Sequence, residues 1–116
     1  MNKIDNKSYN CPIEATLDVV GGKWKVIILW YLYEKTMRFS ELKKVLPGIT
    51  QKMLTQQLRE LERDGMINRK IYAQVPPKVE YSLTEYGKSI KPILQAMLEW
   101  GKKHINKNKN NCEIRK

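Results

Sequence analysis

One short segment in the middle of the 116-residue chain constrains its fold more than any other. A helix is expected over residues 39–46, and the Pro47-Gly48 pair stops it. Thr50 then suits an N-cap, because its side-chain oxygen can accept a hydrogen bond from a free backbone N–H of the next turn. A second helix follows over residues 51–64 and ends at a glycine. Two short helices joined by a tight glycine-containing turn predict a helix-turn-helix.

The second helix of this pair has two chemically different faces. Leu54, Leu58 and Leu61 recur at helical spacing and are expected to face the core. The acidic residues of this helix come only at its far end, so its leading half carries none. The face opposite the leucines carries amides, a hydroxyl and cations, at Gln51, Lys52, Thr55, Gln56 and Arg59.

That polar face suits the major groove of DNA. Glutamine can pair with adenine, arginine with guanine, threonine can contact the thymine methyl group, and lysine can neutralise phosphate. In helix-turn-helix docking the N-terminal part of the second helix enters the groove, which agrees with the absence of acids there. An ordinary amphipathic helix with a solvated polar face is the alternative for this segment alone. The order of the surrounding elements favours DNA binding.

A β-hairpin is expected directly after the helix pair. Residues 67–72 and 78–83 are predicted to be strands, and residues 73–77 form a tip stiffened by two prolines. Such a hairpin is a wing, so the expected fold class is mainly α with a small β-hairpin wing, a winged helix-turn-helix. A solvated hairpin edge is the alternative for its polar side chains. The wing residues expected to contact DNA are Arg69, Lys70, Gln74 and Lys78.

The starts of the two short helices are further candidates for contacts to the DNA backbone. Arg38 and Ser40 can hold phosphate through their side chains and the free N–H groups of the first turn. Simple helix capping is an equally open interpretation of Ser40. Thr50, at the start of the next helix, is assigned to the same backbone contacts.

The outer parts of the chain supply the core and a second apolar surface. A helix is expected over residues 12–20, and residues 23–34 are apolar nearly all round, so this second helix should be the centre of the core. A last helix, capped by Thr84 and kinked or interrupted near Pro92, carries a long apolar stripe. Because the earlier helices already supply a core, the stripe favours a homodimer, with packing on its own domain as the alternative.

The net charge of +10 favours an anionic partner, yet half of it lies in residues 102–116. The alternation of Asn and Lys after residue 105 predicts a disordered low-complexity segment. The expected organisation is therefore a flexible N-terminus over residues 1–10, a winged helix-turn-helix domain with dimerisation helices over residues 11–105, and a basic disordered tail over residues 106–116.

Three segments, in this order, resemble the HxlR-type regulators, bacterial winged-helix transcription factors related to the MarR type: CPIEATLDVVGGKWKVIILWYL, RFSELKKVLPGITQKMLTQQLRELERDGMI and VPPKVEYSLTEYG. The resemblance runs from Cys11 to about His104. It implies a homodimer on a palindromic or inverted-repeat operator in double-stranded DNA. It also implies that the five polar residues named above face the groove and that residues 74–78 form the wing tip. The first and last helices would form the dimer interface, through Ile13, Leu17, Ile93, Met97 and Trp100.

Cys11 is a candidate redox sensor. It precedes the helix that starts at Pro12, and a helix N-terminus favours the reactive thiolate, whereas Glu14, one turn away, opposes it. Some HxlR-type regulators sense oxidants or electrophiles through a cysteine at this place, which the resemblance carries to Cys11. A small buried apolar residue is the alternative. Cys112, in the tail, could reach Cys11 of the other subunit.

An enzyme is the main rival class, and the sequence argues against it. The single histidine, His104, lies near the tail, and no metal-ligand spacing, phosphate loop or nucleophile elbow is present. No cofactor or metal is therefore expected. A winged-helix module that binds protein or RNA is a second rival. A small-molecule effector is a further alternative, in which four aromatic residues line a pocket; such residues are more often core. They are Trp24, Trp30, Trp100 and Tyr86.

The expected address is the cytoplasm, with no membrane partner. The most apolar segment, residues 26–33, is eight residues long, whereas a membrane span needs about 20. The N-terminus has no apolar run of the kind found in a signal peptide. Two cysteines are too few for a disulfide-scaffolded secreted domain.

Overall fold

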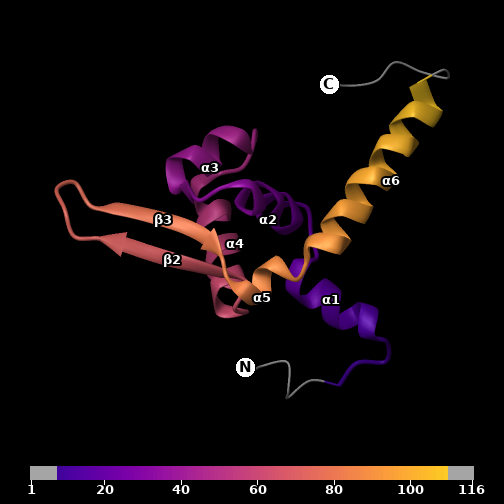
Figure 1. Cartoon of the computed structure of the whole chain (residues 1–116), viewed down its shortest axis with the longest axis horizontal. Helices are drawn as coiled ribbons and strands as arrows, with labels where there is room; N and C mark the ends of the chain where they lie inside the picture. Colours follow the sequence, from indigo (N-terminus) through magenta and orange to yellow (C-terminus); the bar gives the residue numbers. More distant parts are fainter. Residues whose placement is uncertain (1–7, 110–116) are drawn as a thin grey trace.

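The computed structural model describes residues 8–109 of the chain. It confirms the expected fold class, since helices dominate and a small antiparallel sheet forms the wing (Figure 1). The elements, in chain order, are α1 (Pro12–Val20), α2 (Trp24–Glu34), β1 (Met37–Arg38), α3 (Phe39–Val45), α4 (Gln51–Arg63), β2 (Ile67–Tyr72), β3 (Lys78–Leu83), α5 (Glu85–Lys88) and α6 (Lys91–Lys109).

The core is built around α2, as its nearly uniform apolar sequence predicts. Ile28 and Leu29 of this helix are fully buried, and α2 packs against α4, α6 and β3. Burying several leucines and isoleucines removes much apolar surface from water, which is the main term that stabilises such a small domain. The helix α3, its C-cap residue and α4 contribute five further buried leucines: Leu42, Leu46, Leu54, Leu58 and Leu61.

The turn between α3 and α4 has the geometry that its residues predict. Gly48 adopts a φ of 89°, a left-handed conformation that side chains disfavour. The Thr50 hydroxyl oxygen accepts a hydrogen bond from the Met53 backbone N–H at 3.0 Å, which confirms the N-cap. Ile49 and Leu54, which flank this cap, are both buried in the core, as a hydrophobic staple requires.

The wing contains one strand more than the sequence predicts. The strand order is β1-β3-β2, and Met37 of β1 lies opposite Tyr81 of β3. A two-residue strand is too short to show alternation, so its hydrophobic pattern gives no signal. The β2–β3 pairing runs from Ile67 opposite Leu83 to Tyr72 opposite Lys78.

The C-terminal helix is interrupted and then longer than expected. Thr84 caps the four-residue α5, and α6 begins at Lys91, which confirms a break near Pro92. The expectation of disorder from residue 106 is wrong for residues 106–109, because α6 continues to Lys109. Lysine favours helices, and no glycine or proline interrupts these residues. The rest of the expected tail, residues 110–116 with Cys112, lies outside the described residues.

The N-terminal boundary also differs from the expectation. The segment over residues 1–10 is expected to be flexible, and residues 1–7 of it lie outside the described residues. Tyr9 and Asn10, in the described part, are held against α1. The Tyr9 hydroxyl donates to Asp18 at 2.7 Å, and the Asn10 backbone N–H donates to Glu14 at 2.8 Å. The hydrogen bond to Asp18 raises the pKa of Tyr9 to about 12.

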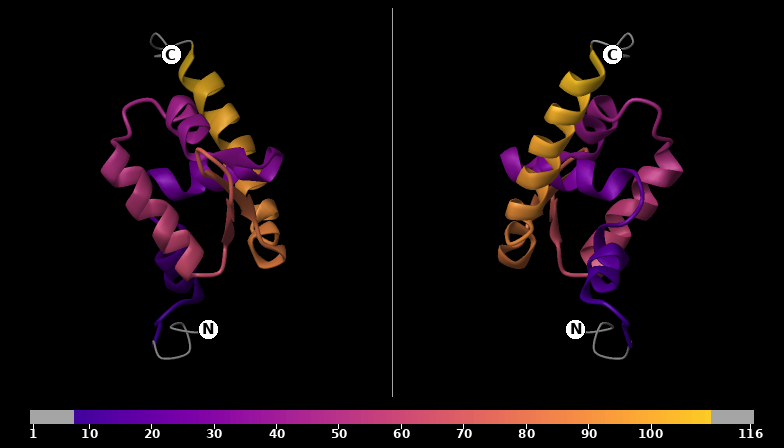
Figure 2. Two further views of the ribbon diagram at one scale, coloured as in Figure 1. Left: turned by 90° about the vertical axis from the view of Figure 1, so that its left-hand side faces the viewer. Right: turned by 90° about the vertical axis from the view of Figure 1, so that its right-hand side faces the viewer.

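Two regions of the molecule are thereby separated in space. The wing projects at one end, whereas α1 and α6 lie at the other (Figure 1). In both side views α4 lies on one side of the hairpin strands, and α5 and α6 lie on the other (Figure 2). Among the described residues, no helix combines the length and apolar character needed to cross a membrane.

Candidate nucleic-acid interface

The structure brings the five predicted reading residues onto one surface of α4. Four of them are exposed, and the fifth, Thr55, is half-buried. This surface, which we call the reading face, is an open depression with a volume of about 730 Å³. Glu60 and Arg63 adjoin the five predicted residues. The full lining is Gln51, Lys52, Thr55, Gln56, Arg59, Glu60 and Arg63.

Thr55 is committed in part to its own helix. Its hydroxyl donates to the backbone oxygen of Gln51 at 2.9 Å. The hydroxyl proton is therefore used inside α4, and the side chain offers an outside partner only an acceptor oxygen and a methyl group.

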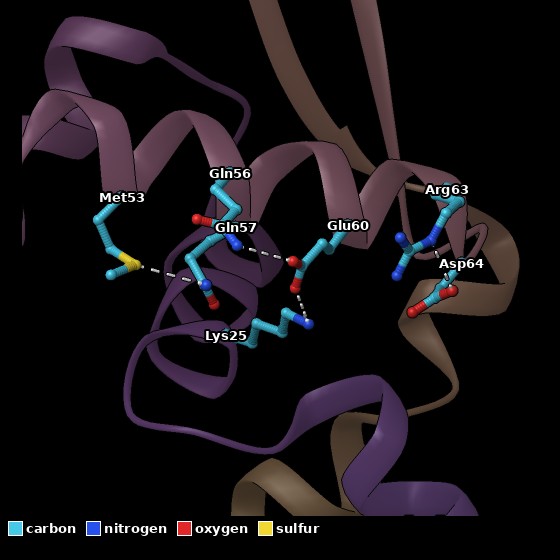
Figure 3. Close-up of polar contacts among 7 residues, drawn as sticks. All are labelled: Lys25, Met53, Gln56, Gln57, Glu60, Arg63 and Asp64. Carbon is cyan, nitrogen blue, oxygen red and sulfur yellow. Dashed lines mark hydrogen bonds and ion pairs between the residues drawn. The ribbon is translucent and has the colours of Figure 1, made fainter.

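An ion pair between a buried lysine and a partly exposed glutamate joins the reading face to the core, and sequence reasoning missed it. Lys25 Nζ of α2 lies 2.6 Å from Glu60 Oε1, and the Gln56 amide nitrogen donates to Glu60 Oε2 at 3.3 Å (Figure 3). The hydrogen bond from Lys25 lowers the pKa of Glu60. A lysine within an apolar helix was the available signal, because a buried ammonium requires an anionic partner.

The second acid of α4 is also paired. Arg69 Nε of β2 lies 3.2 Å from Glu62 Oε1, so this predicted wing residue also ties the hairpin to α4. Burial raises the pKa of Tyr81, which lies beside this pair. A cleft of about 210 Å³ separates α4 from the hairpin there, lined by Thr55, Leu58, Arg59, Glu62, Arg69 and Tyr81.

Two lysines of the wing lie over one aromatic ring. The ammonium groups of Lys70 and Lys78 lie 5.0 and 4.7 Å from the centre of the Tyr72 ring. The Tyr72 hydroxyl donates to Glu80 at 3.0 Å, which lowers the pKa of that carboxyl, and Lys78 pairs with Glu80 at 3.2 Å. Gln74 is exposed at the tip. Glu80, which sequence reasoning did not consider, thus restrains the orientation of Lys78.

The start of α3 differs in one detail from the expectation. Arg38 and Ser40 are both exposed, as contacts to a DNA backbone require. The N-cap of α3 is Arg38, whose backbone N–H donates to the Glu41 carboxylate at 2.8 Å. The capping interpretation of Ser40 is therefore wrong, because this residue lies inside the first turn.

The apolar side chains predicted for a dimer interface are exposed in the single chain. They lie on α1 and α6, at the end of the molecule away from the wing (Figure 1). Large exposed apolar patches mark interaction surfaces in many proteins. The five side chains, which we call the apolar face, are 40–68% exposed and comprise Ile13, Leu17, Ile93, Met97 and Trp100.

Two apolar grooves lie next to this face. One, of about 240 Å³, separates α1 from α5 and α6 and includes Tyr86. The other, of about 270 Å³, includes Trp30, whereas Trp24 packs against the core and Trp100 is exposed. The lining of this second groove is Val26, Ile27, Trp30, Tyr31, Leu94, Met97 and Leu98.

Cys11 is exposed at the N-cap of α1, as the redox interpretation requires. The residue has an extended backbone, and its carbonyl oxygen accepts from the Glu14 backbone N–H at 2.8 Å. The alternative of a buried apolar filler does not describe Cys11 in the single chain.

Comparison with known proteins identifies the family. The model of the HxlR-like helix-turn-helix family matches residues 19–109, most of the chain. The chain belongs to this HxlR-like family. The HTH-type transcriptional regulator YtcD of Bacillus subtilis strain 168 is 60% identical over 104 residues, which span 90% of this chain and 82% of YtcD.

Solved structures agree with this assignment. The redox regulator HypR, in its oxidized form, is 56% identical, with a TM-score of 0.78 over 80% of this chain and 96% of HypR. The reduced form of the transcriptional regulator YodB from B. subtilis is 34% identical, with a TM-score of 0.69 over 79% of this chain and 91% of YodB. This HxlR-like protein is therefore a transcriptional regulator with a helix-turn-helix.

Proposed function

We propose that this HxlR-like regulator binds double-stranded DNA sequence-specifically, with α4 in the major groove. The observation that carries the proposal is the reading face, where four of the five predicted polar side chains are exposed. Both acids next to it are paired with cations, Glu60 with Lys25 and Glu62 with Arg69. The face therefore meets the polyanion without an unpaired carboxylate from either residue.

The proposed assembly is a homodimer on an inverted-repeat operator. The apolar face on α1 and α6 supports it, because a two-fold axis through this face would bury the same patch on both protomers. The wing lies at the opposite end of the chain (Figure 1), so dimerisation leaves it free for DNA. Two α4 helices about 34 Å apart would reach successive turns of one duplex face.

Salt dependence of duplex binding tests the DNA proposal. The probe is a labelled duplex from the intergenic region beside the gene, with an unrelated duplex of equal length as competitor. If about six phosphates are neutralised, affinity falls roughly a thousandfold between about 50 and 200 mM salt. Binding that ignores both salt and sequence would exclude a DNA-reading regulator and favour a protein- or RNA-binding module.

Arg59→Ala tests whether the reading face contacts bases. A bidentate contact from Arg59 to guanine is worth about 1–3 kcal/mol of discrimination, so the substitution relaxes preference at one position of each half-site. Lys102→Ala removes the same charge from α6 and is the matched control. Equal losses on all duplexes would show that Arg59 contacts only phosphate.

A thiol response through Cys11 is the proposed regulation. Its support is the exposed thiol and the similarity to HypR, whose structure is described as that of a redox regulator. Operator affinity should change after diamide treatment of the wild type and stay constant in Cys11→Ser. Unchanged affinity in the treated wild type would remove the sensor role. The groove that contains Trp30 is the alternative place for an effector, in this case a small apolar ligand.

A further inference from the structure

Lys25 is a charged side chain in the core, and its partner lies on the helix proposed to read DNA. Its exposed fraction is 6%, and α2, which carries it, packs against α4. A buried ammonium is stable only when it is paired and hydrogen-bonded. The 2.6 Å contact with Glu60 meets that need, and it holds the Glu60 carboxylate at one edge of the reading face (Figure 3).

The second oxygen of the same carboxylate orients Gln56. Glu60 Oε2 accepts from the Gln56 amide nitrogen at 3.3 Å (Figure 3). An ionised carboxylate can only accept hydrogen bonds, so the amide must turn its nitrogen toward Glu60. The lowered pKa of Glu60 keeps this group ionised at neutral pH. Gln56 therefore offers an outside partner its carbonyl oxygen and its second N–H.

We propose that Lys25 and Glu60 are positioning residues that set which end of the Gln56 amide meets the DNA. This specificity mechanism rests on the proposed function. In the major groove adenine and cytosine present amino groups, whereas guanine and thymine present carbonyl oxygens. Gln56 accepts from the amino group through its carbonyl oxygen, whereas a base carbonyl leaves that oxygen without a donor and can bond only the second N–H. Adenine is the preferred base, because its N7 can also accept the second N–H of the amide.

Glu60→Gln reverses this orientation with little change of shape. The Lys25 ammonium can only donate, so it takes the oxygen of the new amide and leaves that amide's nitrogen toward Gln56. Gln56 must then turn its own oxygen inward and present its nitrogen to the DNA. The preferred base at the Gln56 position shifts from adenine or cytosine to guanine or thymine.

The experiment measures competition binding of the full chain to operator duplexes selected with the wild type from a random library. In these duplexes, each position of the selected operator is replaced by each of the four base pairs in turn. The wild type should prefer adenine or cytosine at the Gln56 position by about fivefold or more. Gln56→Ala should flatten that position alone, and Glu60→Gln should invert it. Gln57→Ala is the matched control, because the Gln57 amide donates to Met53 Sδ at 3.6 Å. This variant should show the base preferences of the wild type.

A double variant covers the case in which Glu60→Gln does not fold. Lys25→Met with Glu60→Leu replaces the ion pair by apolar groups of similar size, which buried pairs often tolerate. It frees the Gln56 amide to rotate, so the preference for adenine or cytosine at the Gln56 position should be weaker than in the wild type and should not invert.

The outcomes separate this inference from the function on which it rests. A wild type without base preference at any position overturns both. A wild type that discriminates bases, together with a folded Glu60→Gln or double variant that keeps the preference at the Gln56 position, overturns only the positioning role. A Gln56→Ala variant with the same base preferences as the wild type also overturns only the positioning role.

Discussion

Removal of one side chain from the apolar face should weaken the proposed dimer without unfolding the protomer. Trp100 is 68% exposed in the single chain and stacks on His104, with a ring-centre distance of 5.0 Å. A tryptophan side chain offers about 200 Å² of surface, so roughly 140 Å² of Trp100 is free for a partner. At about 25 cal/mol per Å², that area is worth roughly 3.5 kcal/mol per protomer.

The consequence for Trp100→Ala is a large change in the dimer dissociation constant. A dimer buries this side chain twice, and burial of only half the free area still contributes roughly 3.5 kcal/mol. The dissociation constant should therefore rise roughly 300-fold. Sedimentation velocity over a range of protein concentrations measures this constant, and the thermal midpoint of the separated protomer should stay the same.

Ile71→Ala is the control for this experiment. Ile71 is 59% exposed on β2, at the other end of the molecule, so its removal deletes a comparable exposed apolar group outside the proposed interface. Equal dissociation constants for wild type and Trp100→Ala, or equal effects of the two substitutions, would refute the assignment of the apolar face.

Three further predictions concern the scaffold that holds α4. Thr50→Ala removes the N-cap and should lower the free energy of unfolding by about 1 kcal/mol in urea titrations; an unchanged midpoint would contradict the cap. Gly87→Ala should cost about 1–3 kcal/mol, because the added Cβ collides with the Met66 carbonyl oxygen. Gly101→Ala, where a Cβ meets no neighbour, is the control and should be neutral or stabilising. The pKa of Glu60 is lower in the folded protein than in the unfolded chain, where it is about 4.3. Ionised Glu60 therefore stabilises the fold fully at pH values above about 4.3, and this stabilisation is lost as the pH falls through the folded pKa. Stability measured against pH should therefore be flatter in the acid range for Glu60→Gln, and parallel curves would contradict the pairing.

The fold could be predicted largely from local signals. The Thr50 cap, the staple and the glycine turn each involve residues close together in the sequence, so the α3–α4 unit can be predicted without tertiary information. The strand Met37–Arg38 was missed because its pairing with β3 joins residues far apart in the chain. The helical state of residues 106–109 was missed because their alternating polar composition has no apolar periodicity, whereas α6 simply continues through them.

The candidate site was predictable in its composition but not in its internal pairing. Helical spacing places the five reading residues on one side of α4, and the structure agrees. The partners of the two acids come from other elements, Lys25 from α2 and Arg69 from β2. No periodicity links these residues, so only their position in space shows that Arg69 supports α4 and that Lys25 reaches Gln56 through Glu60.

The central claim is that α4 reads bases, and selection of bound sequences from a random duplex library tests it most directly. The wild type should enrich an inverted repeat whose half-site centres lie about 10 base pairs apart, one turn of DNA. Arg59→Ala should lose preference at one symmetry-related position in each half-site and keep the rest. An unenriched library, or motifs that are identical for the wild type and Arg59→Ala, would contradict the assignment of the reading face.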